Sequence, residues 1–241
     1  MKFFHRVSIE ILEYFLIIAL CAVPSLFVSE RKEPASLFPS ADIIFFYATA
    51  AVFLLLRSKK SQTFKVRQSA VYKKGKKKCI MLFLHTPVYG LLCFCLLIAS
   101  ALLWNYIAKI SGRAELPPVS LPRTYTERLL FFISAIVLAS YEEIVFRFFL
   151  PERGLAIIHD IAPESEKSKS GFVLKAAAET IPIVLFALAH RYLGLFAVGN
   201  ALCAAIILRL ALYKKLHITL LCAVHAAYNI TIFIALSCMR S

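Results

Sequence analysis

The sequence predicts an all-α fold: a polytopic transmembrane helical bundle of about seven membrane helices, with a range of six to eight. Hydrophobic residues make up 60% of the 241 positions and the mean hydropathy is +0.76, whereas soluble domains are about 45–50% apolar. A membrane span needs about 20 apolar residues. Stretches of about this length occupy residues 8–28, 41–57, 80–108, 126–150, 172–190, 193–213 and 217–238.

The first stretch is expected to be a retained helix. Glu10 and Glu13 interrupt it, and it lacks the small-x-small cleavage site of a signal peptide.

The formal net charge of +14 is concentrated in one segment between the second and third stretches. Its basic residues, without an intervening acid, are Arg57, Lys59, Lys60, Lys65, Arg67, Lys73, Lys74, Lys76, Lys77 and Lys78. A basic loop between two spans stays in the cytoplasm and contacts anionic lipid headgroups, so we do not expect nucleic-acid binding. The N-terminus and the loops 151–171 and 214–216 are then cytoplasmic. Compact size and short loops favour a bacterial inner (cell) membrane.

Three charged residues interrupt the fourth stretch: Glu142, Glu143 and Arg147. An ionisable group at mid-bilayer costs about 2.5–3.5 kcal/mol, so it usually faces the bundle interior and serves a function. Glu143 and Arg147 are four residues apart, which favours an ion pair on one helix face, whereas Glu142 points about 100° away. We therefore expect a structural Glu143–Arg147 pair and a general base at Glu142. A buried salt-bridge cluster that only fixes helix packing is the alternative.

Two later stretches carry pairs with the same spacing: Phe186 with His190, and His225 with Asn229. The members of each pair share a helix face. Packing does not require such a set, but peptide hydrolysis can use a base for water and donors for an oxyanion. We predict that Glu142 and His190 activate water, while His225 and Asn229 direct donors at the oxyanion. Phe186 either shapes the pocket or packs as an ordinary bundle aromatic.

A shared site requires these residues to lie at one depth in the membrane. A helix that begins at Phe172 would place His190 about 27 Å from its start, near the outer face. We therefore expect this span to begin near Pro182, with Thr180 as its cap and Gly171–Glu179 as a preceding interfacial segment.

The motifs EExxxR, FxxxH and HxxxN, in this order on successive membrane segments, resemble the CPBP family, the CAAX proteases and bacteriocin-processing enzymes. The resemblance covers about residues 126–232, with one departure: Phe148 follows Arg147 where the family usually has glycine. It implies an intramembrane glutamic-type endopeptidase, CAAX prenyl endopeptidase-like, without a metal or other cofactor. The expected catalytic residues are Glu142, His190, His225 and Asn229, and the supporting residues are Glu143, Arg147 and Phe186.

The chain would then divide into two parts of one continuous membrane domain. Residues 1–125 are expected to form N-terminal membrane helices with the basic cytoplasmic loop, and residues 126–238 a CPBP-like catalytic core. The substrate would be a membrane-anchored peptide or protein, such as a prenylated CAAX protein, a leader peptide or a bacteriocin.

Three other interpretations remain open. Two histidines and a carboxylate can bind zinc with an open position, although the sequence lacks HExxH. The same buried groups can form the relay of a proton-coupled transporter, although we find no symmetry typical of inverted repeats. A non-catalytic membrane scaffold or immunity protein of the same family is the third.

Overall fold

The computed structural model describes residues 2–21, 35–36, 41–59, 77–112, 119–120, 122, 124–161, 168–214 and 216–238. In this part of the chain the α-helices are α1 (Lys2–Cys21), α3 (Ala41–Lys59), α5 (Lys77–Ile110), α6 (Tyr125–Glu142), α7 (Leu150–Ile161), α8 (Lys169–Ala189), α9 (Leu195–Tyr213) and α10 (Ile218–Cys238). A π-helix, η1 (Glu143–Phe149), joins α6 to α7, and a 3-10 turn, η3 (Arg191–Leu193), lies between α8 and α9. Two short strands, β1 (Ala35–Ser36) and β2 (Val119–Ser120), pair in parallel.

The prediction of an all-α bundle of about seven helices is confirmed. The segments α6, η1 and α7 follow one another without a break and count as one helical rod, so the described residues form seven rods. Within the described residues, five helical stretches are long and apolar enough to cross a membrane. They are Pro87–Ile110, Tyr125–Ile161, Lys169–Leu193, Leu195–Tyr213 and Ile218–Cys238.

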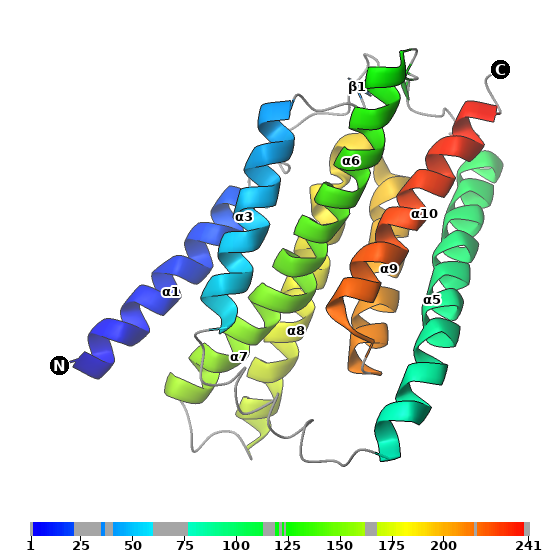
Figure 1. Ribbon diagram of the computed structural model, residues 1–241. Helices are drawn as coiled ribbons and strands as arrows, with labels where there is room; N and C mark the ends of the chain where they lie inside the picture. The colour runs from blue at the N-terminus through cyan, green and yellow to red at the C-terminus, as the bar shows by residue number, and fades with distance from the viewer. Residues whose placement is uncertain are drawn as a thin grey trace.

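Successive rods run in alternating directions (Figure 1). The N-terminal end of α1, helix α7 and the start of α10 lie at one end of the bundle, and the C-terminal end of α10 lies at the other end with the start of α6. The π-helix η1 contacts α3, α6, α7, α8, α9 and α10. It therefore occupies the centre of the bundle, where any polar group that it carries is shielded from lipid.

The α8 helix begins earlier than we predicted from the depth argument. It starts at Lys169, where the Ser168 hydroxyl accepts a hydrogen bond from the Gly171 N–H, and it continues through Pro182. Neither a start near Pro182 nor a cap at Thr180 is therefore correct. A proline inside a membrane helix is tolerated because neighbouring helices and local adjustments compensate for the missing hydrogen bond.

The expected loop 151–171 is also largely wrong. Residues 150–161 form α7, and its buried side includes Leu150, Arg153, Gly154 and Ala156. This spacing of three and four residues is that of one helix face. Residues 60–76, which carry most of the basic loop, lie outside the described residues.

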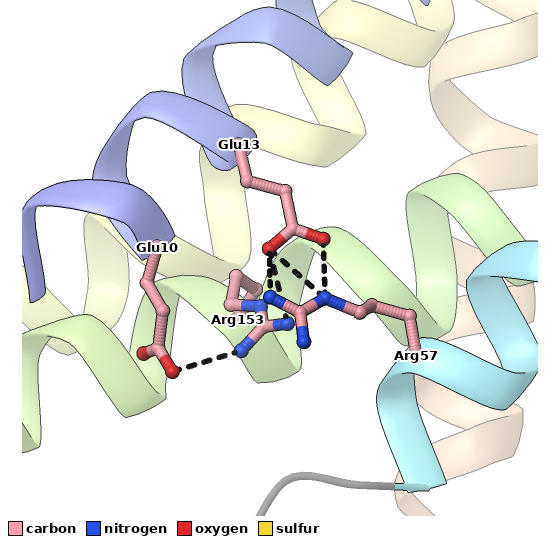
Figure 2. Close-up of polar contacts among 4 residues, drawn as sticks. All are labelled: Glu10, Glu13, Arg57 and Arg153. Atoms are coloured by element: carbon pink, nitrogen blue, oxygen red, sulfur yellow. Dashed lines mark hydrogen bonds and ion pairs between the residues drawn. The ribbon is translucent and has the colours of Figure 1, made fainter. Parts of the chain in front are cut away.

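The N-terminal helices are joined to α7 by ion pairs (Figure 2). The Nε atom of Arg57 on α3 donates to a Glu13 carboxylate oxygen of α1 at 2.9 Å. On α7, the buried Arg153 lies 3.5 Å from the carboxylates of both Glu10 and Glu13. Two acids and two bases thus neutralise each other where α1, α3 and α7 meet.

Polar side chains also connect α5, α9 and α10. The Ser100 hydroxyl donates to the Asn200 side-chain carbonyl at 2.9 Å, and the Asn200 amide donates to the Tyr228 hydroxyl at 2.8 Å. Because the three partners satisfy one another, they fix the relative placement of the helices that flank the centre.

Gly199 permits the close approach of α9 to α5, and its replacement by alanine is expected to destabilise the fold. A methyl group there would overlap the Trp104 indole ring, and overpacking costs about 1–3 kcal/mol. Thermal unfolding of the detergent-solubilised protein should show a lower Tm for Gly199→Ala, and a second change, Trp104→Leu, should restore it.

Gly90→Ala is the matched control, because the nearest atoms to a methyl group there are those of the flexible Leu220 side chain. A wild-type Tm for Gly199→Ala would contradict the close packing of α5 and α9.

Candidate active site

The π-helix η1 owes its position to a proline that follows it. Pro151 has no N–H, and its ring crowds the carbonyl of Arg147, four residues earlier. The backbone widens before this point, and the Leu150 N–H donates to the Val145 carbonyl, five residues back. Short π-helices inside α-helices are frequent at functional sites. Here the widened turn carries Glu143 and Arg147, with Glu142 immediately before it.

Glu142 and Glu143 approach opposite nitrogens of one imidazole. The Glu143 carboxylate lies 2.8 Å from His225 Nδ1, and the Glu142 carboxylate lies 3.7 Å from His225 Nε2. The Glu143 side chain is fully buried, whereas that of Glu142 is 25% exposed. A buried carboxylate accepts from Nδ1–H, which fixes the orientation of the ring and directs Nε2 toward Glu142.

Arg147 balances this buried charge. Its Nη1 atom lies 3.5 Å from the Glu143 carboxylate, so the ion pair predicted from the spacing is present. The guanidinium carbon also lies 3.6 Å from the centre of the Phe186 ring. An arginine over an aromatic face is stabilised by a cation–π interaction, and Phe186 therefore closes the apolar side of the cluster.

His190 reaches the same aromatic ring from the C-terminal end of α8. Its ring centre lies 4.6 Å from that of Phe186, and the Phe186 ring centre lies 6.3 Å from that of His225. The Nδ1 atom of His190 lies 2.9 Å from the Phe186 carbonyl oxygen. Because a carbonyl only accepts, Nδ1 carries the proton of a neutral ring and Nε2 remains an acceptor. Phe186 thus separates two imidazoles with different hydrogen-bond partners.

The structure brings together six of the seven residues that we predicted from the motifs: Glu142, Glu143, Arg147, Phe186, His190 and His225. Asn229 lies one turn after His225 and is half-buried, and we find no hydrogen bond from its side chain to another described residue. The contact between Glu142 and His225 was not anticipated, since we had paired Glu142 with His190. The individual roles stay predictions.

Two further charged residues belong to the surroundings of the site and were missed. Arg209 on α9 is buried, forms an ion pair with Glu179 on α8, and donates to the backbone carbonyl of Arg147. Arg209 and Glu179 are each a charged residue in an apolar stretch, and such a residue usually has a partner. This signal was available in the sequence.

The cluster offers acid–base groups rather than a ready ligand set for a metal. Within the described part of the chain, His, Cys, Asp and Glu side chains do not gather in groups of three or more that could hold a metal ion. Two carboxylates, one imidazole and one guanidinium are instead grouped at the centre of the bundle. Such an arrangement can accept and return a proton inside an apolar bundle.

Residues 124–231 match a family model described as type II CAAX prenyl endopeptidase Rce1-like. The match confirms the resemblance to CAAX proteases predicted from the three motifs. Searches of curated proteins and of solved structures found no significant match.

Removal of Arg147 alone should destabilise the protein more than removal of both charges. Breaking a buried ion pair by deleting one partner costs about 3–5 kcal/mol, because the other charge stays buried without compensation. In detergent, Arg147→Met should therefore lower the Tm strongly, and Glu143→Leu/Arg147→Met should lower it less.

Arg57→Met serves as the control, since the Arg57 side chain is 36% exposed in its pair with Glu13 and such pairs are worth about 0–1 kcal/mol. Equal loss of stability in the single and double variants at 143 and 147 would contradict the pairing.

Proposed function

Because residues 124–231 match the family model of Rce1-like type II CAAX prenyl endopeptidases, we propose that this integral membrane protein hydrolyses peptide bonds of membrane-anchored substrates at the cluster around His225. One observation carries the proposal: adjacent glutamates on η1 and α6 contact the two nitrogens of this buried imidazole. A CAAX-type intramembrane protease acts on substrates that reach it within the bilayer. The finer assignments differ in the substrate, which is either a prenylated CAAX protein or a leader peptide.

Glu142 and His190 are proposed to activate the attacking water. Glu142 has the more exposed of the two adjacent carboxylates, so water can reach it. The Nδ1–H of His190 is engaged with the Phe186 carbonyl, which leaves Nε2 to accept a proton from that water. A carboxylate and a neutral imidazole are both suitable general bases. The mechanism is then of the glutamic type.

His225 and Asn229 are proposed to stabilise the tetrahedral oxyanion. With Nδ1–H directed at Glu143, a second proton on Nε2 would make His225 a cationic donor and cancel the negative charge of the two carboxylates and Arg147. Asn229 is one turn further along the same helix face and adds an amide donor. Preorganised donors in a water-poor site stabilise developing charge more strongly than donors in water do.

We further propose that the end of the bundle with the N-terminus and α7 faces the cytoplasm. The basic residues between α3 and α5 would then contact anionic headgroups. A bacterial inner membrane remains our proposed location.

Glu142→Gln and His190→Gln should each lower kcat by about 10²–10⁴-fold, since each removes a group that accepts a proton in the transition state. The assay offers the solubilised protein a farnesylated CAAX peptide, its unprenylated form and a membrane-anchored leader peptide, with products identified by mass. His217→Gln and Glu152→Gln are matched controls outside the cluster and should keep wild-type activity.

Cleavage by folded Glu142→Gln or His190→Gln at the wild-type rate would refute these roles. If the wild type cleaves none of the peptides, the hydrolase proposal fails for all three substrate classes.

Asn229→Ala should lower kcat by about 10²–10³-fold with little change in KM, because an oxyanion donor acts mainly in the transition state. The effect of Asn229→Ala is measured in the same cleavage assay, with kcat and KM determined separately. Asn200→Ala is the comparison, since Asn200 is bonded to Ser100 and Tyr228 away from the cluster. A rise in KM with unchanged kcat would assign Asn229 to substrate binding instead.

A further inference from the structure

Pro151 leaves the helix of the candidate site without one of its regular hydrogen bonds. In an α-helix the N–H of residue 151 would donate to the Arg147 carbonyl, and a proline cannot do so. A buried carbonyl without a partner is unfavourable. The Arg147 carbonyl therefore lacks the donor that an α-helix would give it, and a donor from another part of the bundle can take that place.

Arg209 supplies this donor. Its Nη1 atom donates to the Arg147 carbonyl, while its Nε and Nη2 atoms each donate to a Glu179 carboxylate oxygen at 2.6 Å. The Arg209 side chain is 6% exposed. Three bonds to fixed partners hold the planar guanidinium in one orientation, so α8 and α9 together present a rigid donor to η1.

The bonded carbonyl belongs to the residue that supports the candidate site. The Arg147 side chain pairs with Glu143, and Glu143 hydrogen-bonds His225 at 2.8 Å. Glu142 precedes this turn directly, so a rotation of η1 would move both carboxylates relative to the imidazole. A displacement of about 1 Å in a catalytic constellation can cost about 10²-fold in rate.

We propose that Arg209 is a positioning residue for catalysis: it donates the hydrogen bond that Pro151 denies to the Arg147 carbonyl, and so fixes η1 with Glu142 and Glu143 on either side of His225. This inference rests on the proposed endopeptidase function. Glu179 holds the Arg209 guanidinium in place and neutralises its charge. Arg209 acts through the backbone of η1 and touches no reacting atom.

The competing explanation is an ion pair that only joins α8 to α9. The two explanations differ for Glu179→Met/Arg209→Met, which removes both charges. Replacement of a buried ion pair by apolar residues of similar volume is often neutral or stabilising, so this double variant is expected to fold even where Arg209→Met does not. It still leaves the Arg147 carbonyl without its donor.

The first measurement is cleavage of the farnesylated CAAX peptide by the solubilised full chain. We expect Glu179→Met/Arg209→Met to keep a Tm near that of wild type and to lose about 100-fold in kcat, with KM little changed. Arg57→Met is the matched control: it removes an ion pair that joins α3 to α1, away from η1, so most of the activity should remain. Wild-type kcat in the folded double variant would overturn the proposal.

A second measurement reads the geometry without any substrate. The ¹⁵N NMR signals of the His225 imidazole, assigned by their loss in His225→Gln, report its hydrogen bond to Glu143. They should shift in Glu179→Met/Arg209→Met and stay in place in Arg57→Met. Unchanged signals in the double variant would overturn the positioning role. If wild-type protein cleaves no peptide but the signals shift, the endopeptidase proposal fails while the positioning of η1 by Arg209 stands.

Discussion

A single hydrogen bond between the Glu143 carboxylate and the His225 imidazole connects η1 with α10 at the centre of the bundle. A fully buried carboxylate is unfavourable without compensating partners, so its position also determines those of Arg147 and of the Phe186 ring on which Arg147 lies. The same contacts therefore both pack α8 and α10 around η1 and arrange the reactive groups. A change in either alters the other.

The helices were predictable because each apolar stretch is a separate, strong signal of span length. The α7 helix was not, since hydropathy treats Arg153 and Gly154 as loop residues, whereas the fold buries both against α1 and α8. Pro182 misled in another way. Proline favours a first helical turn, but an alternative cap at Ser168 and tight packing place it in the middle of α8.

For the site, helical spacing predicted the Glu143–Arg147 pair because both residues belong to one helix. Spacing holds no information about which residue of another helix lies opposite, so it could not show that His225 lies between the two glutamates. It was equally silent on Arg209, whose partner in η1 is a backbone carbonyl. That acceptor becomes apparent only after the π-helix and Pro151 are seen together.

The ion pairs among α1, α3 and α7 bear on how much of the chain the family core requires. The matched region, residues 124–231, contains Arg153 but neither Glu10 nor Glu13. A chain shortened to that region would retain every motif residue and still hold a guanidinium in an apolar layer without its two carboxylates. Helix α1 therefore supplies the core with the counterions of Arg153. An unrelated helix in its place would have to carry acidic residues at matching positions.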